Sequence, residues 1–219
     1  HRQLPNEPLI FVEVALVPSI STDVGVLINK KTDVGAPKTF KTAIFYSISN
    51  CQPGLKGVSL GNFLIKRVAQ KLIDDIPTLK TFSTLSPIPG FTQWMDQGAQ
   101  LTTFDATPTQ LKRFDAAIST LRLGERKWSE RLKDGWHPSN CPAEHQEALK
   151  RLCALYLMHY THERRGDSVA KFHLANGATL YQINWAADLS KKGLQQSAGL
   201  MVNYLYELDK VETQHEAFS

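Results

Sequence analysis

The sequence lacks the features that define several classes of protein. Its three cysteines, Cys51, Cys141 and Cys153, include no C-x-x-C pair, so neither a disulfide framework nor a zinc knuckle is predicted and a reducing compartment is favoured. No apolar run is long enough to cross a bilayer. Lys and Arg exceed Asp and Glu by only 25 to 21 and are interleaved with them, without the dense basic stripe of a nucleic-acid binder. The sequence therefore predicts neither a membrane nor a nucleic acid as a partner.

Targeting signals are also missing from the two ends of the sequence. The first residues, His1 to Pro5, have neither the charge pattern nor the apolar core of a signal peptide, and the last three, Ala217 to Ser219, are not a peroxisomal address. A strand follows the first residues directly, as if the chain began partway through a longer protein. We expect the cytoplasm of a bacterium or the matrix of an organelle.

The residues that are present suit a folded domain with a core, since 42% are apolar and 21% are charged. β-branched and aromatic residues predict strands at 9–17 and 42–49, joined as a hairpin with a long loop. Apolar residues at helical spacing then predict a helix from Ser59 to Ile76, which Pro77 ends. A third strand at 80–85 completes a strand–helix–strand order that predicts an α/β sheet with a right-handed crossover.

The second half of the sequence first becomes helical and then returns to strands. Helices are predicted within 91–165, where Thr107 is a helix cap followed by proline at the first helical position. Strands are predicted at 178–185 and 199–208. The simplest account is a single α/β domain over residues 1–219 with a helical insertion at about 97–165.

A glycine-punctuated loop at 50–58 is the first candidate site. Gly54, Gly57 and Gly61 let a backbone approach a ligand closely, and the following helix offers free N–H groups and a positive dipole end to a phosphate. An equally good alternative to phosphate binding is that the glycines serve only the turn. Residues 57–61 formally match the G-x-S-x-G nucleophile elbow, but the long loop separates Ser59 from its strand. We favour Ser59 as a helix cap or a phosphate neighbour over a nucleophile.

The segment Ser83 to Phe91 is the second candidate site. It follows the third strand, and ligands of open α/β sheets bind beyond the carboxyl ends of strands. Pro87 and Pro89 stiffen the segment, so the hydroxyl of Ser86 would be held in place. A rigid turn with a capping serine is the alternative.

His173, within the segment Val169 to Ala178, is the third candidate. A satisfied structural histidine is the more common role for such a residue among apolar neighbours, but the Asn176-Gly177 turn would leave this ring near the mouth of the next strand. His159 and His162 have metal-ligand spacing without an evident third ligand, so no metal site is predicted.

Four segments together resemble malonyl-CoA decarboxylase, in the order of that family: AIFYSISNCQPGLKGVSLGNFLIKRV, FSTLSPIPGF, VAKFHLANGATLYQINWAADLS and GLMVNYLYEL. The opening EPLIFVEVAL also matches. The resemblance covers nearly the whole chain and is weakest from Gln97 to Arg165. It implies a catalytic domain with a GNAT-like acyltransferase fold, an α/β fold with a mixed sheet and flanking helices.

The resemblance also implies roles for particular residues. The catalytic residues of the family correspond to Ser86, His173 and Tyr206. Its coenzyme A pyrophosphate loop corresponds to Lys56, Gly57, Val58, Ser59, Leu60, Gly61 and Asn62. Members carry an acidic residue at the position of Ser59, so the family does not use it as a nucleophile. They also have a helical oligomerisation domain ahead of the catalytic domain, which is missing here. The full-length protein is therefore expected to be a homo-oligomer.

The implied activity is the decarboxylation of malonyl-CoA to acetyl-CoA and carbon dioxide through a thioester enolate. The thioester accepts the electron pair itself, so no metal or other cofactor is expected, and coenzyme A is part of the substrate. Two alternatives stay open from the residues alone. One is a GNAT-type N-acetyltransferase that uses acetyl-CoA, and the other is a non-catalytic acyl-CoA sensor.

Overall fold

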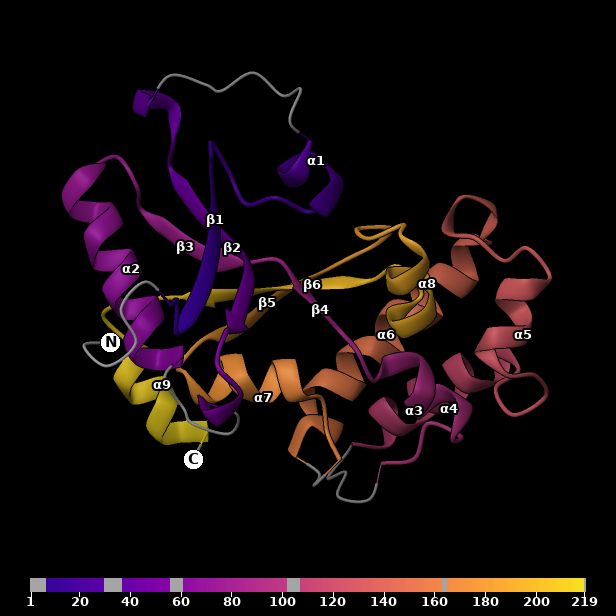
Figure 1. Cartoon of the computed structure of the whole chain (residues 1–219). Coiled ribbons are helices and arrows are strands. Elements are labelled where there is room, and N and C mark those ends of the chain that lie inside the picture. Colours follow the sequence, from indigo (N-terminus) through magenta and orange to yellow (C-terminus); the bar gives the residue numbers. More distant parts are fainter. Residues whose placement is uncertain (1–6, 30–36, 56–60, 102–106, 163–164, 219) are drawn as a thin grey trace. The chain divides into compact units, whose positions relative to one another are not determined.

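A computed structural model describes residues 7–29, 37–55, 61–101, 107–162 and 165–218, which form two compact units (Figure 1). Unit 1 contains the chain up to Ser86, residues 174–180 and the chain from Asn203 onward, and unit 2 contains 87–173 and 181–202. The strands are β1 (Ile10–Val17), β2 (Thr42–Asn50), β3 (Thr81–Thr84), β4 (Ser86–Pro87), β5 (Thr179–Asn184) and β6 (Met201–Tyr206). The helices are α1 (Val24–Ile28), α2 (Gly61–Asp75), α3 (Phe91–Asp96), α4 (Pro108–Leu121), α5 (Trp128–Lys133), α6 (Ala143–Met158), α7 (Ser168–Ala175), α8 (Lys191–Ser197) and α9 (Val211–Phe218).

The sheet is mixed. Its strand order is β1-β2-β3-β6-β4, and β5 also pairs with β6. β1 and β2 are antiparallel from Ile10↔Asn50 to Val17↔Thr42, with an irregularity after Glu13. β2 and β3 are parallel, and β3 and β6 are antiparallel. These pairings confirm the predicted long hairpin, and the parallel pair joined through a helix is the predicted strand–helix–strand unit.

α2 connects β2 to β3 within unit 1. Its inward face buries Ile65 and Ala69, as expected for apolar residues that recur at helical spacing. The helix ends at Asp75, two residues before the predicted stop signal at Pro77. The predicted start at Ser59 lies outside the described residues. α2 and α9 lie side by side (Figure 1), and Lys66 Nζ is 3.2 Å from Glu212 Oε1 between them.

Unit 2 contains the predicted helical insertion. α4 begins as predicted, because the Thr107 hydroxyl accepts from the backbone N–H of Gln110 at 3.3 Å and Pro108 is the first helical residue. Aromatic rings make up much of its core: Phe91, Trp94 and Tyr156 are all buried, and the Trp94 and Tyr156 ring centroids are 5.2 Å apart. Trp128 is buried too.

Four short helices were absent from the sequence-based expectations. α1 contains five residues, α7 eight, α8 seven and α9 eight. Segments this short show only about two turns, so apolar periodicity cannot distinguish them from strands or loops. Trp136 and Trp185 are only partly buried. Among the helices described, none is both long and apolar enough to cross a membrane.

Candidate functional site

Ser86 is the first residue of β4, separated by one residue from the end of β3; it belongs to unit 1 and is 4% exposed. Its Oγ donates to Oγ1 of Thr84 at 2.9 Å. Thr84, also fully buried, accepts at the same oxygen from the backbone N–H of Tyr204 at 3.1 Å. The Ser86 hydroxyl is therefore held through Thr84 to the backbone of β6, in addition to the stiffness that Pro87 provides.

A second contact between β3 and β6 involves Asn203, which is fully buried. Its side-chain Nδ2 donates to the Thr84 carbonyl at 2.6 Å and to the Ser21 carbonyl at 3.1 Å. Ser83 Oγ donates in turn to the Tyr204 carbonyl at 3.0 Å. Buried polar groups are stable only when they are hydrogen-bonded, and these bonds give the end of β3 next to Ser86 a polar and well-determined environment.

Tyr206 is the last residue of β6, and it stands opposite Phe82 of β3 in the antiparallel register. Its side chain is buried. Burial raises the pKa of Tyr206, because a phenolate is poorly solvated there. The phenol is thus neutral at physiological pH and can act as a hydrogen-bond donor.

His173 lies in the last turn of α7, in unit 2, and is 4% exposed. Phe172 stands edge-on to the imidazole, with the ring centroids 5.1 Å apart. Burial lowers the pKa of His173 to about 3, because the cationic ring would lose its hydration. The imidazole is therefore neutral at physiological pH. The turn predicted after it is present, since Gly177 has φ +73°.

Asp167, which the sequence analysis did not single out, is a buried carboxylate immediately before α7. Its Oδ1 accepts from the backbone N–H of Val169 at 3.0 Å and of Ala170 at 2.9 Å. Its Oδ2 accepts from the Tyr156 hydroxyl at 3.3 Å, and the Gly90 backbone N–H is a further donor. Burial raises the pKa of Asp167, and the hydrogen bonds oppose that effect. The carboxylate joins three segments of unit 2.

The structure distributes the predicted residues over both units. Ser86 and Tyr206 belong to unit 1 and His173 to unit 2, and a joint action of Ser86 and His173 stays a prediction. Of the predicted pyrophosphate loop, residues 56–60 lie outside the described part of the chain, and Gly61 and Asn62 begin α2. Asp167 could have been found from its sequence, because aspartate before a helical segment is a common N-cap. Thr84 and Asn203 carried no such signal.

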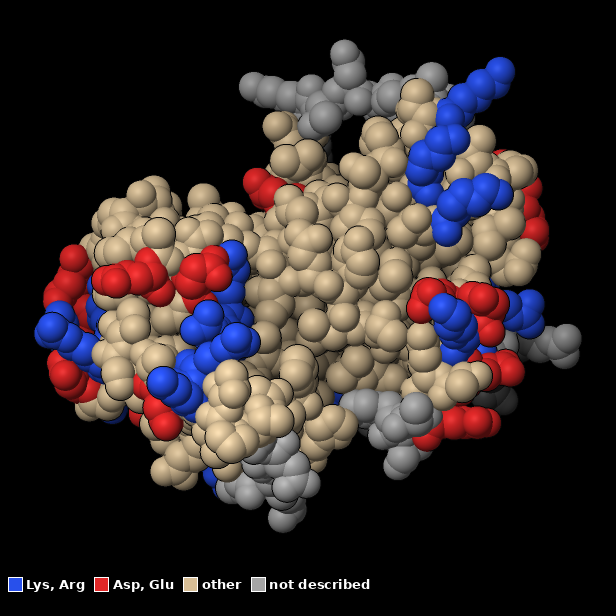
Figure 2. All heavy atoms as spheres, turned by 180° about the vertical axis from the view of Figure 1, so that it is seen from behind, with Lys and Arg blue, Asp and Glu red and all other residues tan. Residues whose placement is uncertain are grey.

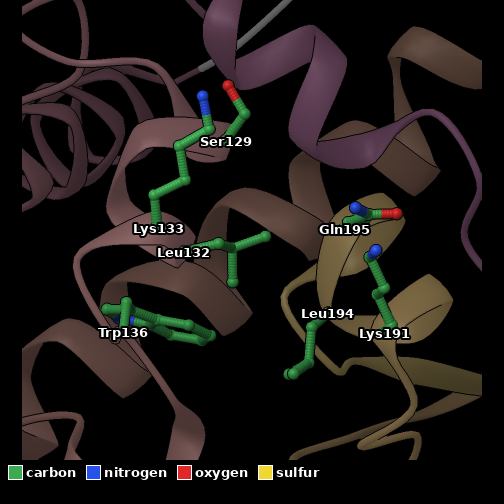
Figure 3. A pocket seen from close by; sticks show the side chains of 7 residues that line it. All are labelled: Ser129, Leu132, Lys133, Trp136, Lys191, Leu194 and Gln195. Carbon is green, nitrogen blue, oxygen red and sulfur yellow. The ribbon is translucent and has the colours of Figure 1, made fainter.

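A hollow of about 570 Å³ lies within unit 2, between α5 and α8 (Figure 3). Leu132, Trp136 and Leu194 give it apolar walls, and Lys133 and Lys191 stand at its edges. α5 and α8 are held together by the Trp128 indole, which donates to the Leu194 carbonyl at 2.9 Å. None of the three predicted catalytic residues lines this hollow.

On the face seen in Figure 2, Lys and Arg lie among Asp and Glu at the left and the lower right, and a small group of Lys and Arg lies at the upper right. Among the described residues, several charged side chains form ion pairs, such as Lys71 with Asp75 at 2.7 Å and Lys150 with Glu147 at 2.7 Å. Within the described ranges, no three His, Cys, Asp or Glu side chains are grouped so that they could hold a metal ion.

Comparison with known proteins gives consistent matches. The family model described as the malonyl-CoA decarboxylase C-terminal domain matches residues 1–219. Mitochondrial malonyl-CoA decarboxylase of Anser anser anser is 38% identical over 100% of this chain and 45% of its own length. The mitochondrial enzyme of Mus musculus is 40% identical over 96% of this chain and 44% of its own length. The chain thus spans less than half the length of these relatives.

Solved structures agree with the sequence matches. The crystal structure of malonyl-CoA decarboxylase from Cupriavidus metallidurans matches with a TM-score of 0.74 and 38% identity, over 100% of this chain and 53% of that one. The enzyme from Rhodopseudomonas palustris matches with a TM-score of 0.75 and 35% identity, over 99% and 50%. The predicted α/β class with a mixed sheet is confirmed. From its first residue to its last, the chain belongs to the malonyl-CoA decarboxylase family and corresponds to the C-terminal domain of that family.

Proposed function

We propose that this chain decarboxylates malonyl-CoA to acetyl-CoA and carbon dioxide, and that Ser86 and His173 are its catalytic side chains. The observation that carries the proposal is the match to the family over residues 1–219. It is supported by the burial of both side chains, since a catalytic hydroxyl or imidazole acts most strongly where water is excluded. An N-acetyltransferase or a non-catalytic sensor has no comparable support.

The reaction makes a limited demand on the protein. The bond between the carboxylate carbon and C2 of the malonyl group breaks, carbon dioxide leaves, and the electron pair moves onto the thioester oxygen as an enolate. C2 then takes up one proton to give acetyl-CoA. The thioester is its own electron acceptor, so the chemistry needs no metal or further cofactor. The protein must anchor the coenzyme, orient the carboxylate and stabilise the enolate.

Ser86 is suited to a hydrogen bond with the substrate. Its hydroxyl donates to Thr84 Oγ1 in the free chain. Hydroxyl hydrogens rotate, so the Thr84 hydroxyl can donate to Ser86 while its own oxygen still accepts from the Tyr204 N–H. The Ser86 hydrogen would then be available for the malonyl carboxylate or for relay of a proton. This exchange keeps both the hydrogen bond between Ser86 and Thr84 and the one from Tyr204.

His173 is suited to the protonation of C2. Its pKa of about 3 keeps the imidazole neutral before substrate binds, and a nearby anion raises the pKa of a histidine. The malonyl carboxylate, and then the enolate, would supply that anion. The proton would be taken up with the substrate and delivered after carbon dioxide leaves, and solvent would replace it. In this scheme Tyr206 is a neutral donor that orients one of the two residues.

The pyrophosphate of coenzyme A is assigned to residues 56–62. The support within the described part of the chain is α2, a helix of 15 residues that begins at Gly61. The first N–H groups of a helix have no partner within it and bear the positive end of the dipole, which favours phosphate oxygens.

The setting in the cell is also a proposal. A reducing compartment is supported by free thiols at Cys51, Cys141 and Cys153. A bacterial cytoplasm or an organelle matrix would provide it, and the full-length protein would be a homo-oligomer.

The test is to incubate the purified chain with malonyl-CoA in deuterium oxide and to follow the acyl-CoA species by mass. Decarboxylation predicts acetyl-CoA with one deuterium in its methyl group, together with carbon dioxide. Free coenzyme A with malonate would indicate a hydrolase. Acetyl-CoA that is consumed only when an amine is added would indicate an acetyltransferase. Binding without any product would indicate a sensor, and each of these three results would contradict the proposal.

A further inference from the structure

Asp167 connects the helix that carries His173 to the segment that follows Ser86. On one side its Oδ1 caps α7 through the backbone N–H groups of Val169 and Ala170. On the other side it accepts from the backbone N–H of Gly90, which ends the Ser-Pro-Ile-Pro-Gly segment. All of these contacts lie within unit 2.

Tyr156 of α6 packs so closely against Gly90 that position 90 has little room for a side chain. A Cβ built at Gly90 would lie 2.4 Å from the Tyr156 hydroxyl oxygen, far inside van der Waals contact. Tyr156 is itself fully buried and donates to Asp167 Oδ2 at 3.3 Å. Its ring packs at a tilt against that of Phe91, the residue after Gly90, with the ring centroids 5.7 Å apart. Gly90, Tyr156 and Asp167 therefore form a tightly packed junction between α3, α6 and α7.

The junction has more donors than a helix cap needs. One or two backbone N–H groups suffice for capping, whereas Asp167 receives four donors from three segments. A buried carboxylate without such donors would be strongly unfavourable. The four bonds together therefore hold Gly90 and the first turn of α7 at one spacing. The sequence distance between these segments, 87–90 and 168–175, leaves no local restraint that could do the same.

We propose that Asp167 is a positioning residue for the decarboxylation, which fixes the start of the His173 helix against the segment after Ser86 and so sets the imidazole in its working orientation. This inference rests on the proposed function. It gives Asp167 no contact with the substrate, so the residue acts on the chemical step through His173 and not on the affinity for coenzyme A. A misplacement of about 1 Å in a catalytic group costs on the order of a hundredfold in rate.

The test compares Asp167→Asn with a matched cap variant, Ser190→Ala. Asn keeps an oxygen that can cap α7 but loses the charge and replaces the second acceptor by a donor. Ser190 caps α8 in the same unit through the Gly193 N–H at 3.0 Å and has no part in the junction. Tyr156→Phe removes only the fourth donor and keeps the packed ring. For each variant, kcat, KM for malonyl-CoA, the melting temperature and amide hydrogen exchange of residues 87–91 and 168–175 are measured.

We expect Asp167→Asn to lower kcat by roughly ten- to a hundredfold, with KM within about twofold of the wild type. Tyr156→Phe should lower kcat less, and Ser190→Ala should lower the melting temperature while kcat stays within about twofold. Amide exchange at Gly90 and in the first turn of α7 should become faster together in Asp167→Asn. A normal kcat in a folded Asp167→Asn chain would overturn the proposal, as would a rise in KM alone.

The exchange measurement separates this inference from the proposed function. If the wild-type chain produces no acetyl-CoA, the assignment of activity to this chain fails, while the exchange data still decide whether Asp167 couples the two segments. Faster exchange confined to α7 would reduce Asp167 to a helix cap and overturn the positioning role.

Discussion

The pH dependence of stability provides the sharpest test of how His173 is buried. The imidazole has a pKa of about 3 in the folded chain against 6.5 when unperturbed. The unfolded chain therefore binds a proton at this residue between these values, and the folded chain does not. A lowered pKa means that the stability from this group is fully present above pH 6.5 and is lost as the pH falls toward 3.

The size of the effect follows from linkage. Proton binding by His173 in the unfolded chain makes the ratio of unfolded to folded chain about 30-fold larger at pH 5 than at pH 8, which corresponds to about 2 kcal/mol. The assay is urea denaturation at pH 8 and pH 5 for the wild type and for His173→Asn, which has no group that titrates there. The wild type should lose about 2 kcal/mol more between the two pH values than the variant does.

The double difference removes the contribution of other groups. Asp167, whose pKa is raised, acts in the opposite direction, and it does so in both proteins. His145→Asn, at a less buried histidine of α6, controls for the loss of a histidine as such and should retain the behaviour of the wild type. An equal loss of stability in the wild type and in His173→Asn would refute the argument, because it would mean that the ring is hydrated in the folded chain.

Three further predictions concern the same regions. His173→Asn should lower the decarboxylation rate by a factor of roughly 10²–10⁴, as expected when a general acid is removed, and should still bind coenzyme A in calorimetry. Activity within twofold of the wild type would remove His173 from the mechanism. Ser86→Ala should cut turnover of malonyl-CoA strongly and cost only about 0.5–1.5 kcal/mol of stability, whereas Ser59→Ala should retain most turnover and cost about 0.5–2 kcal/mol of stability. Turnover and thermal melts of both variants provide the measurement. An inactive Ser59→Ala beside a near-normal Ser86→Ala would favour a hydrolase. Gly90→Ala should lose about 1–3 kcal/mol of stability through overpacking, because its Cβ would lie 2.4 Å from a buried tyrosine hydroxyl. Gly54→Ala is the control, because a Cβ at Gly54 would have nothing within 4 Å. Equal melting temperatures for the two variants would contradict the packing argument.

Local pattern in the sequence was sufficient for the larger elements. β-branched runs predicted β1, β2 and β3, helical spacing predicted α2, and the Thr107-Pro108 pair predicted the start of α4. Each of these signals depends on residues within a few positions of one another, so the sequence alone contains them. The candidate residues Ser86, His173 and Tyr206 came from long segments that resemble one family, and membership of that family is confirmed.

Other properties were decided only when distant segments met. Thr84 receives hydrogen bonds from Asn203 and Tyr204, 119 and 120 positions later, and no local pattern indicates such partners. The pKa of His173 is lowered by burial, which depends on what packs over α7 and not on its neighbours in sequence. Asp167 could be recognised from sequence as a helix cap, but its bond to Gly90, 77 positions earlier, exists only in the folded chain. Hydrogen bonding and desolvation act through space, so the environment of each candidate side chain was set by the tertiary structure.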